Sequence, residues 1–306
     1  MSTPRLVIHE VGLRDGLQME HETVPTATKL RWLKALAATG VDIIQAGSFV
    51  HPTRVPQMAD TDALFRDLMA PGGLPSGVVL SGLVLNEKGL ERGLACGVRM
   101  FCMGVSASET HSQKNTGMSV AEATTRIIAT AQQAIAAQCA VQVSVQSAFG
   151  CGFEGAVPED RVLGIVRRYL DAGLTNISLA DTAGHAAPDA VERLFAAVRA
   201  MDARAELTCH FHNTYGMAVA NCIAALRAGV TAFESSVAGL GGCPFTKVAG
   251  GNVCTEDLVH MFQRMGERTD IQLDGIIAVA REVAEYFHRD MPGMIYKTGP
   301  IRSTQG

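Results

Sequence analysis

Eight short apolar runs alternate with eight longer segments of helical periodicity along this chain of 306 residues. The first run is RLVIHEV, which precedes TATKLRWLKALAATG, and the last is AFESSVAGL, which precedes TEDLVHMFQRMG. Runs rich in β-branched residues predict strands, and apolar residues repeated every three or four positions predict amphipathic helices. Gly40, Gly97, Gly173 and Gly229 follow predicted helices, as is usual after a helix C-terminus. Repeated strand–helix units of this kind build a parallel sheet with helices outside it.

Eight such units without a break in composition predict an α/β fold of the (β/α)8 TIM-barrel class. We expect one domain over residues 1–306, with the barrel over about 5–268 and additional C-terminal helices over about 270–290. An open, doubly wound sheet is the alternative. It is disfavoured because no GxGxxG phosphate-binding loop follows the first strand.

Composition narrows the class of partner. A hydrophobic content of 47% with 18% charged residues indicates a globular protein, and a net charge of −4 predicts no nucleic-acid or membrane partner. No apolar run approaches the roughly 18–20 residues that span a bilayer, and the first residues run directly into a strand-like segment, so we expect no signal peptide. Eight cysteines without a CxxC pair do not suggest a disulfide framework and predict a cytoplasmic location.

The segment CHFHNTYG holds two of the nine histidines, His210 and His212, at the end of the seventh predicted strand. Side chains two residues apart leave a strand on the same face, so both imidazoles point one way, as at a metal site or in a shared core. Asp15 follows the first strand and Asn252 lies in the glycine-rich loop after the eighth. Strands one, seven and eight are neighbours in a closed barrel, so these four side chains can converge. Two imidazoles with oxygen ligands suit Mg²⁺ or Mn²⁺.

Other strand ends supply further polar side chains, and active sites of TIM barrels form at these ends. We expect the substrate to be bound by Arg14, Gln18, Gln45 and Ser48. The polar segment SASETHSQKN after the fourth strand is expected to be a loop. Because barrels with added C-terminal helices often pair through them, we also expect a homodimer.

Five segments resemble the 3-hydroxy-3-methylglutaryl-CoA lyase family over about residues 5–290: EVGLRDGLQME, GSFVHPTRVPQM, SLADTAG, CHFHNTYGMAVAN and SSVAGLGGCPFTKVAGGNVCTEDLV. The resemblance implies a divalent cation, Mg²⁺ or Mn²⁺, held by Asp15, His210, His212 and Asn252. It implies that Arg14 interacts with the thioester oxygen and that Cys243 lies on a mobile loop near the reacting carbons. It also implies an acyl-CoA substrate, which is cleaved to acetyl-CoA and a ketoacid.

The residue types fit that chemistry. Cleavage of the C2–C3 bond requires loss of the C3 hydroxyl proton, collapse to a ketone and departure of a thioester enolate. A metal lowers the pKa of the hydroxyl, and a fixed guanidinium such as that of Arg14 stabilises the enolate. The thiol of Cys243 is a candidate acid for the enolate carbon, and Asp181 is a candidate for carrying the hydroxyl proton or supporting the metal ligands. The predicted catalytic residues are therefore Arg14, Asp181 and Cys243.

Three positions depart from the family pattern. Gln45 stands where a glutamate is usual, Ser144 where a tyrosine is usual, and Asn213 where an aspartate follows the second histidine. The expected metal ligands are retained while the pocket walls differ. The alternative is therefore a citramalyl-CoA lyase, which releases pyruvate, or a lyase for another branched 3-hydroxyacyl-CoA. A condensing synthase and a non-catalytic metal-binding protein are the alternatives from other classes.

Overall fold

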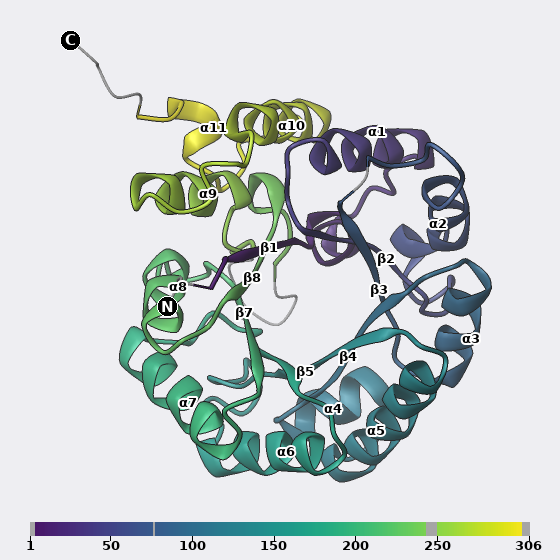
Figure 1. The fold of residues 1–306 in the computed structure, drawn as a ribbon, viewed down its shortest axis with the longest axis vertical. Helices are drawn as coiled ribbons and strands as arrows, with labels where there is room; N and C mark the ends of the chain where they lie inside the picture. Colours follow the sequence, from purple (N-terminus) through teal and green to yellow (C-terminus); the bar gives the residue numbers. More distant parts are fainter. Residues whose placement is uncertain (1–3, 76, 243–249, 302–306) are drawn as a thin grey trace.

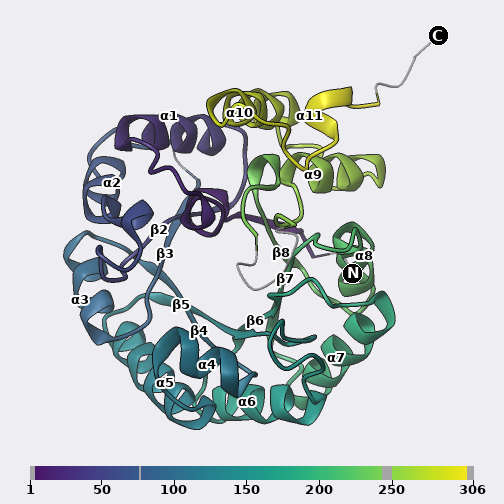
Figure 2. The same cartoon turned by 180° about the vertical axis from the view of Figure 1, so that it is seen from behind.

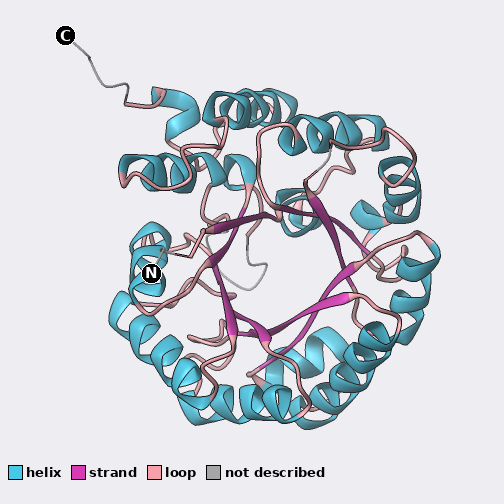
Figure 3. Cartoon of the chain, in the orientation of Figure 1, coloured by secondary structure: helices cyan, strands magenta, loops and turns pink. Residues whose placement is uncertain are grey.

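Eight parallel strands close into a barrel in which each strand pairs with the next and β8 returns to β1 (Figures 1 and 3). The computed structural model describes residues 4–75, 77–242 and 250–301. The strands are β1 (Val7–Glu10), β2 (Ile43–Ser48), β3 (Val79–Leu83), β4 (Met100–Ser106), β5 (Ala140–Gln146), β6 (Asn176–Asp181), β7 (Glu206–Phe211) and β8 (Ala232–Ser235). The predicted TIM-barrel class is confirmed.

Helices surround the barrel on its outside (Figure 2). Those of the ring are α1 (Thr26–Ala37), α2 (Thr61–Leu68), α3 (Glu87–Ala95), α4 (Glu109–Thr116), α5 (Val120–Ala136), α6 (Glu159–Asp171), α7 (Pro188–Met201), α8 (Ala218–Arg227) and α9 (Thr255–Arg264). Two more, α10 (Leu273–Tyr286) and α11 (Ile295–Thr298), lie beside α9, and α10 also packs on α1. The expected C-terminal helices are therefore present.

The segment expected to be a polar loop after β4 contains a helix, so that expectation is wrong. The Ser108 side chain caps α4 by accepting a hydrogen bond from the backbone N–H of His111, 3.1 Å away. A serine at this position satisfies one of the free N–H groups of the first helical turn. The helix lacks an apolar stripe that sequence periodicity could reveal, because its residues are nearly all polar.

The barrel interior is polar in places, and the strand register shows where. Residues paired across parallel strands project to the same side of the sheet. His9 of β1 pairs with Glu234 of β8, and Glu234 pairs with His210 of β7. The residues one position earlier, such as Ile8 and Phe233, are buried hydrophobic side chains of the core. Ionisable side chains therefore lie on one side of this part of the sheet and apolar side chains on the other.

A second polar row runs across β4 to β7. Gly104 of β4 pairs with Ser144 of β5, which pairs with Ser178 of β6, and Ser178 pairs with Thr208 of β7. Three hydroxyl side chains and one glycine thus occupy neighbouring positions on four consecutive strands. The small size of these residues leaves room inside this part of the barrel.

Two further observations concern the helices and the cysteines of the described residues. No helix within the described ranges is long and apolar enough to cross a membrane. The seven cysteines that the structure describes are free thiols, so none of them takes part in a disulfide. The predicted cytoplasmic location stays a prediction.

The close approach of β4 and β5 predicts an asymmetric response to two glycine substitutions. A Cβ at Gly104 would lie 2.5 Å from the Ser144 carbonyl oxygen, so Gly104→Ala should lower the free energy of unfolding by about 1–3 kcal/mol. In α6, a Cβ at Gly164 would meet no atom within 4 Å, so Gly164→Ala should raise the free energy of unfolding by up to about 1 kcal/mol. Urea denaturation of both variants checks this, and equal effects would contradict the packing described.

Candidate active site

A tight π-helical turn, η1 (Gly12–Gly16), follows β1 and carries Arg14 and Asp15 to the carboxyl end of the barrel. The carboxylate of Glu10 accepts hydrogen bonds from the N–H of Gly12 at 2.7 Å and from the N–H of Val237 at 3.0 Å. One buried side chain thus holds the start of this turn against the segment that follows β8. The turn is fixed by contacts that do not involve the side chains it presents.

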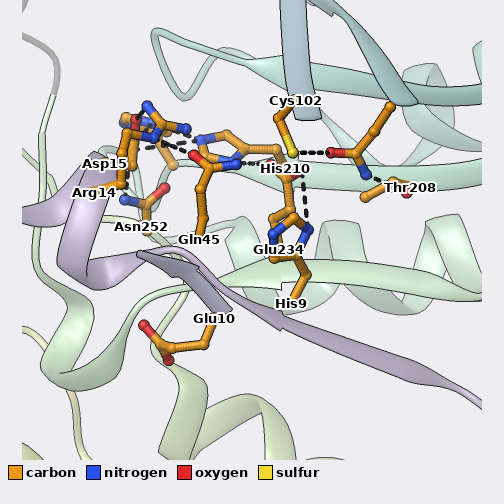
Figure 4. Close-up of polar contacts among 12 residues, drawn as sticks. His9, Glu10, Arg14, Asp15, Gln45, Cys102, Thr208, His210, Glu234 and Asn252 are labelled. Atoms are coloured by element: carbon orange, nitrogen blue, oxygen red, sulfur yellow. Dashed lines mark hydrogen bonds and ion pairs between the residues drawn. The ribbon is translucent and has the colours of Figure 1, made fainter. Parts of the chain in front are cut away.

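Asp15, His210 and His212 form the cluster that the sequence predicts. Asp15 Oδ2 lies 3.8 Å from Nε2 of each histidine, and the two Nε2 atoms are 3.1 Å apart. Figure 4 shows Asp15 and His210 close together at this site. One donor atom from each residue falls within 4.8 Å of the others, which is the spacing of groups that share one ion. Both histidines are buried, and Asp15 is nearly so.

Asn252 joins the same cluster through its amide. Its Nδ2 donates to Asp15 Oδ2 at 2.9 Å and to the Leu240 carbonyl oxygen at 3.0 Å. Its Oδ1 is buried and takes no hydrogen bond from the residues that the structure describes. A buried amide oxygen without a donor is costly unless a cation or another group satisfies it. Nitrogen and oxygen donors of this kind fit a divalent cation bound between them.

Glu234 orients one of the histidines. His210 donates from Nδ1 to Glu234 Oε2 at 2.7 Å, so its Nε2 faces Asp15 and His212. The other carboxylate oxygen of Glu234 lies 3.7 Å from His9 Nδ1, and His9 Nε2 is 2.9 Å from the Ser81 hydroxyl. A carboxylate behind a metal-binding imidazole fixes the tautomer and the direction of the ring. Sequence analysis missed Glu234 and His9, although a histidine inside the apolar run RLVIHEV was a detectable signal.

Burial and charged neighbours shift the pKa values of the aspartate and the histidines in this site. Burial alone would raise the pKa of Asp15, but Arg14 and the two histidines outweigh burial and hold it well below its usual range. Burial and the neighbouring His210 lower the pKa of His212 to about 4, and burial lowers that of His9 to about 4. Burial alone would lower the pKa of His210, but the hydrogen bond to Glu234 and the charges of Glu234 and Asp15 outweigh burial and raise it. An ionised aspartate and neutral imidazoles are the states that ligate a metal, so a cation would bind here with release of the His210 proton.

Arg14 is held between two side chains at the edge of this cluster. Its Nη1 donates to Asp15 Oδ1 at 2.6 Å and its Nε donates to the side-chain oxygen Oε1 of Gln45. Gln45 therefore contacts the guanidinium as a neutral acceptor, so that Asp15 is the anionic partner of Arg14. A guanidinium fixed in this way is pre-oriented for an oxygen that gains negative charge.

A cavity of about 510 Å³ opens at the carboxyl ends of the strands beside the cluster. Of the predicted site residues, those that line it are Arg14, Asp15, Gln18, Gln45, His210 and His212. Ser48 does not line the cavity, and its backbone N–H donates to Thr61 Oγ1 at 3.2 Å. Cys243 lies outside the described residues. The cavity thus brings together three of the four predicted metal ligands, Arg14 and two of the other predicted substrate-binding residues, whereas Asn252 does not line it.

Asp181 ends β6 with both of its oxygens in use. Oδ1 accepts from the N–H of His185 at 2.8 Å and Oδ2 from the N–H of Ala186 at 3.0 Å. The residues on either side of it, Ala180 and Thr182, line the cavity, whereas Asp181 does not. These contacts make Asp181 an organiser of the loop after β6.

Two buried glutamates hold the loops of the site. Glu10 binds Gly12 and Val237 as described above, and Glu256 accepts from the N–H of Ala238 at 3.0 Å. Burial raises the pKa of Glu10 to about 7 and that of Glu256 to about 8, although hydrogen bonds to both carboxylates work in the opposite direction. The loop around η4 (Val237–Gly239) is therefore hydrogen-bonded to Glu10 and Glu256, two carboxyl groups with raised pKa values.

A closed parallel barrel with an aspartate and two histidines at its strand ends defines a (β/α)8-barrel enzyme of the metal-binding kind. The chain matches the HMGL-like family model over residues 5–283 and belongs to that family, as a lyase. It is 39% identical to the hydroxymethylglutaryl-CoA lyase of Pseudomonas mevalonii over 90% of this chain and 91% of that protein. The 3-hydroxy-3-isohexenylglutaryl-CoA/hydroxymethylglutaryl-CoA lyase of Pseudomonas aeruginosa is 36% identical over 92% of this chain and 93% of its own length.

Solved structures agree with the sequence comparison. An HMG-CoA lyase from Acinetobacter baumannii, in complex with coenzyme A and 3-methylmalate, superposes with a TM-score of 0.90. It is 36% identical, and the match covers 99% of this chain and 97% of that one. The predicted family resemblance is confirmed.

The contact between Glu234 and His210 predicts a loss of metal affinity. Glu234→Leu should weaken binding of Mn²⁺ about 10–100-fold, because the His210 ring loses the acceptor that orients it. Glu234→Gln, which keeps an acceptor oxygen, should lose less. Isothermal titration with Mn²⁺ measures both, and Glu206→Leu, at the exposed start of β7, is the control. Unchanged affinity in Glu234→Leu would contradict this role.

The raised pKa of Glu256 predicts a pH-dependent stability. Between its ordinary value of 4.5 and about 8, the folded state holds a proton that the unfolded state releases, so stability is full below pH 4.5 and is lost as the pH rises towards 8. The slope approaches about 1.4 kcal/mol per pH unit. Glu256→Gln should flatten this slope in urea titrations from pH 5 to 9, whereas exposed Glu285→Gln should not. Parallel slopes in wild type and Glu256→Gln would disprove the assignment.

Proposed function

We propose that this lyase cleaves 3-hydroxy-3-methylglutaryl-CoA to acetyl-CoA and acetoacetate, with Mg²⁺ or Mn²⁺ as its cofactor. The observation that carries the proposal is the cluster of Asp15, His210 and His212 beside Arg14 in one cavity. Relatives that match over nearly the whole chain are named for this substrate. The reaction needs a polarised hydroxyl and a stabilised enolate within one small site, which is what this group of residues offers.

The proposed position of the cation follows from the available donor atoms. Asp15, His210, His212 and the amide oxygen of Asn252 would hold the cation, and Glu234 would keep His210 in the ligating tautomer. A divalent cation bound there supplies Lewis-acid polarisation of the C3 hydroxyl of the substrate. The neutral and anionic ligands suit both candidate metals, so the choice between them rests on measurement.

Arg14 acts on the thioester side of the C2–C3 bond that breaks. As the C2–C3 bond opens, negative charge moves to the thioester oxygen, and the guanidinium of Arg14 stabilises it there. Asp15 and Gln45 hold Arg14 on two sides, so that little reorientation is needed when the charge develops. C3 becomes the ketone carbon of acetoacetate as its hydroxyl proton is released to solvent. C2 takes up one proton to become the methyl group of acetyl-CoA, so no net proton is gained or lost.

Two residues from the sequence prediction keep proposed roles in this reaction. Cys243, which lies outside the described residues, is the proposed acid for C2, because a thiol can donate a proton to the enolate carbon. Asp181 is proposed as a positioning residue, since its oxygens accept backbone hydrogen bonds and its neighbours Ala180 and Thr182 line the cavity. The expected homodimer and cytoplasmic location are retained as proposals.

One observation favours a second substrate. The solved relative from Acinetobacter baumannii binds 3-methylmalate together with coenzyme A. This diacid has one carbon fewer in its main chain than 3-hydroxy-3-methylglutarate, and it shares its four-carbon chain and hydroxyl group with citramalate, although its methyl group is on the neighbouring carbon. A citramalyl-CoA lyase activity, which would release pyruvate, is the second candidate for this chain.

A metal-dependent cleavage assay tests the proposal. Purified protein with Mg²⁺ or Mn²⁺ should release acetyl-CoA and acetoacetate from 3-hydroxy-3-methylglutaryl-CoA, and Arg14→Gln should lower kcat at least about 100-fold while Mn²⁺ still binds. Asp181→Asn should lower the melting temperature and leave Mn²⁺ affinity within about threefold, because an amide cannot accept both backbone hydrogen bonds.

The same assay separates the alternatives. Pyruvate from citramalyl-CoA, without acetoacetate from the first substrate, would establish the second candidate instead. Loss of turnover in Asp181→Asn with unchanged melting temperature and metal affinity would assign Asp181 to proton transfer rather than to loop positioning.

A further inference from the structure

The side-chain amide of Asn252 links the metal cluster to a second segment of the chain. Its Nδ2 donates to Asp15 Oδ2 at 2.9 Å and to the backbone carbonyl oxygen of Leu240 at 3.0 Å (Figure 4 labels Asn252 and Asp15). A carbonyl oxygen can only accept, so the contact with Leu240 requires the nitrogen of the amide, not its oxygen, on this side. The oxygen, Oδ1, is buried and takes no hydrogen bond from the described residues. The two ends of this amide therefore have different partners to satisfy.

The segment that accepts this hydrogen bond, residues 240–242, reaches the cavity. Leu240 is completely buried, and Gly242 lines the cavity together with Arg14 and Asp15. The carbonyl oxygen of Leu240 also accepts from the backbone N–H of Asn252, 3.5 Å away. Both hydrogen bonds from Asn252 to this segment thus meet at one atom. The position of this part of the cavity wall therefore depends on where Asn252 holds that carbonyl.

The 240–242 segment packs closely on the amide and on the turn that carries Asp15. A Cβ at Gly241 would lie 2.6 Å from Asn252 Nδ2, and a Cβ at Gly16 would lie 2.6 Å from Leu240 Cβ. Neither position has room for a side chain. Because packed groups of this kind cannot shift independently, a displacement of the amide also displaces the segment.

The two ends of the Asn252 amide belong to one planar group, so a ligand on the oxygen also fixes the direction of the nitrogen. In the proposed cation site Oδ1 is the ligand atom, and Nδ2 remains with the Leu240 carbonyl oxygen. Without a cation, the amide is held by hydrogen bonds from Nδ2 and its buried oxygen is unsatisfied, which is costly. Occupancy of the cation site therefore changes how firmly the amide is held.

We infer that Asn252 is a positioning residue that couples occupancy of the cation site to the position of the 240–242 segment. The inference rests on the cation site of the proposed function. With a cation at Oδ1, the amide holds the Leu240 carbonyl through Nδ2, and the cavity wall at Gly242 is fixed. Coupling between two sites is reciprocal, so a disturbance of the segment must weaken cation binding by the same route.

Hydrogen exchange of the backbone N–H groups of residues 240–242, followed by mass spectrometry with and without saturating Mn²⁺, tests the first direction. In the wild-type protein Mn²⁺ should slow this exchange about tenfold. Asn252→Asp keeps an oxygen for the cation but has no N–H for the Leu240 carbonyl, so Mn²⁺ should still bind while the slowing falls below about twofold. Gln133→Glu makes the same change on the exposed face of α5 and should behave as the wild type.

Gly241→Ala tests the reverse direction, because its Cβ displaces the Asn252 amide without altering a metal ligand. Isothermal titration should show that Mn²⁺ affinity falls about tenfold or more. Gly266→Ala is the matched control. Gly241 and Gly266 both have a positive φ, 110° and 85°, but a Cβ at Gly266 would meet no atom within 4 Å, so Mn²⁺ affinity should stay unchanged there.

The outcomes separate the inference from the proposed function. Equal slowing in wild type and Asn252→Asp, or no slowing in wild-type protein that binds Mn²⁺, would overturn the inference. Unchanged Mn²⁺ affinity in Gly241→Ala would also overturn it. In each of these cases, metal-dependent cleavage of 3-hydroxy-3-methylglutaryl-CoA by the wild type would leave the proposed function standing. Wild-type protein that binds neither Mn²⁺ nor Mg²⁺ would overturn the proposed cofactor and the inference together.

Discussion

The pairing of β8 with β1 is the constraint on which the site depends. Asp15 follows β1, the two histidines end β7, and Asn252 follows β8, so these residues are neighbours only when the barrel is closed at this seam. Four register pairs join β1 and β8, from Val7 with Ala232 to Glu10 with Ser235. A slip of β1 by one residue would turn His9 outward and bring Ile8 into the barrel. The positions of the predicted metal ligands therefore depend on the same register that buries the apolar core.

Some parts of this arrangement could be predicted from the sequence, because they follow local rules. The period of two brings His210 and His212 to one face, and the strand–helix repeat fixes which strands are neighbours. The helix α4 could not be predicted in this way, because a polar segment capped by Ser108 has no apolar period. The orientation of the Asp181 side chain could not be predicted either. Whether an aspartate at a strand end faces the cavity or the loop depends on which backbone N–H groups of the loop lie near it.

The role of Glu234 could not be predicted from the sequence either. It precedes two serines in AFESSVAGL and has no spacing motif with His210, 24 residues earlier. Only the pairing of β7 with β8 places its carboxylate against Nδ1. Burial alone would raise the pKa of Glu234, but the hydrogen bond to His210 and its charge outweigh burial and lower it. The carboxylate therefore stays ionised inside the barrel, where an unpaired charge would be costly.

The two departures in the pocket act on different parts of the reaction. Gln45 touches Arg14 with a neutral oxygen, so the guanidinium keeps Asp15 as its anionic partner and retains more of its positive field for the thioester oxygen. A glutamate there would compete with the substrate for the same charge. Ser144 instead lies on β5, whose cavity-lining residues Gln142, Ser144 and Gln146 are polar and uncharged. The two departures therefore lie on different strands of one cavity, and only Gln45 contacts the guanidinium of Arg14.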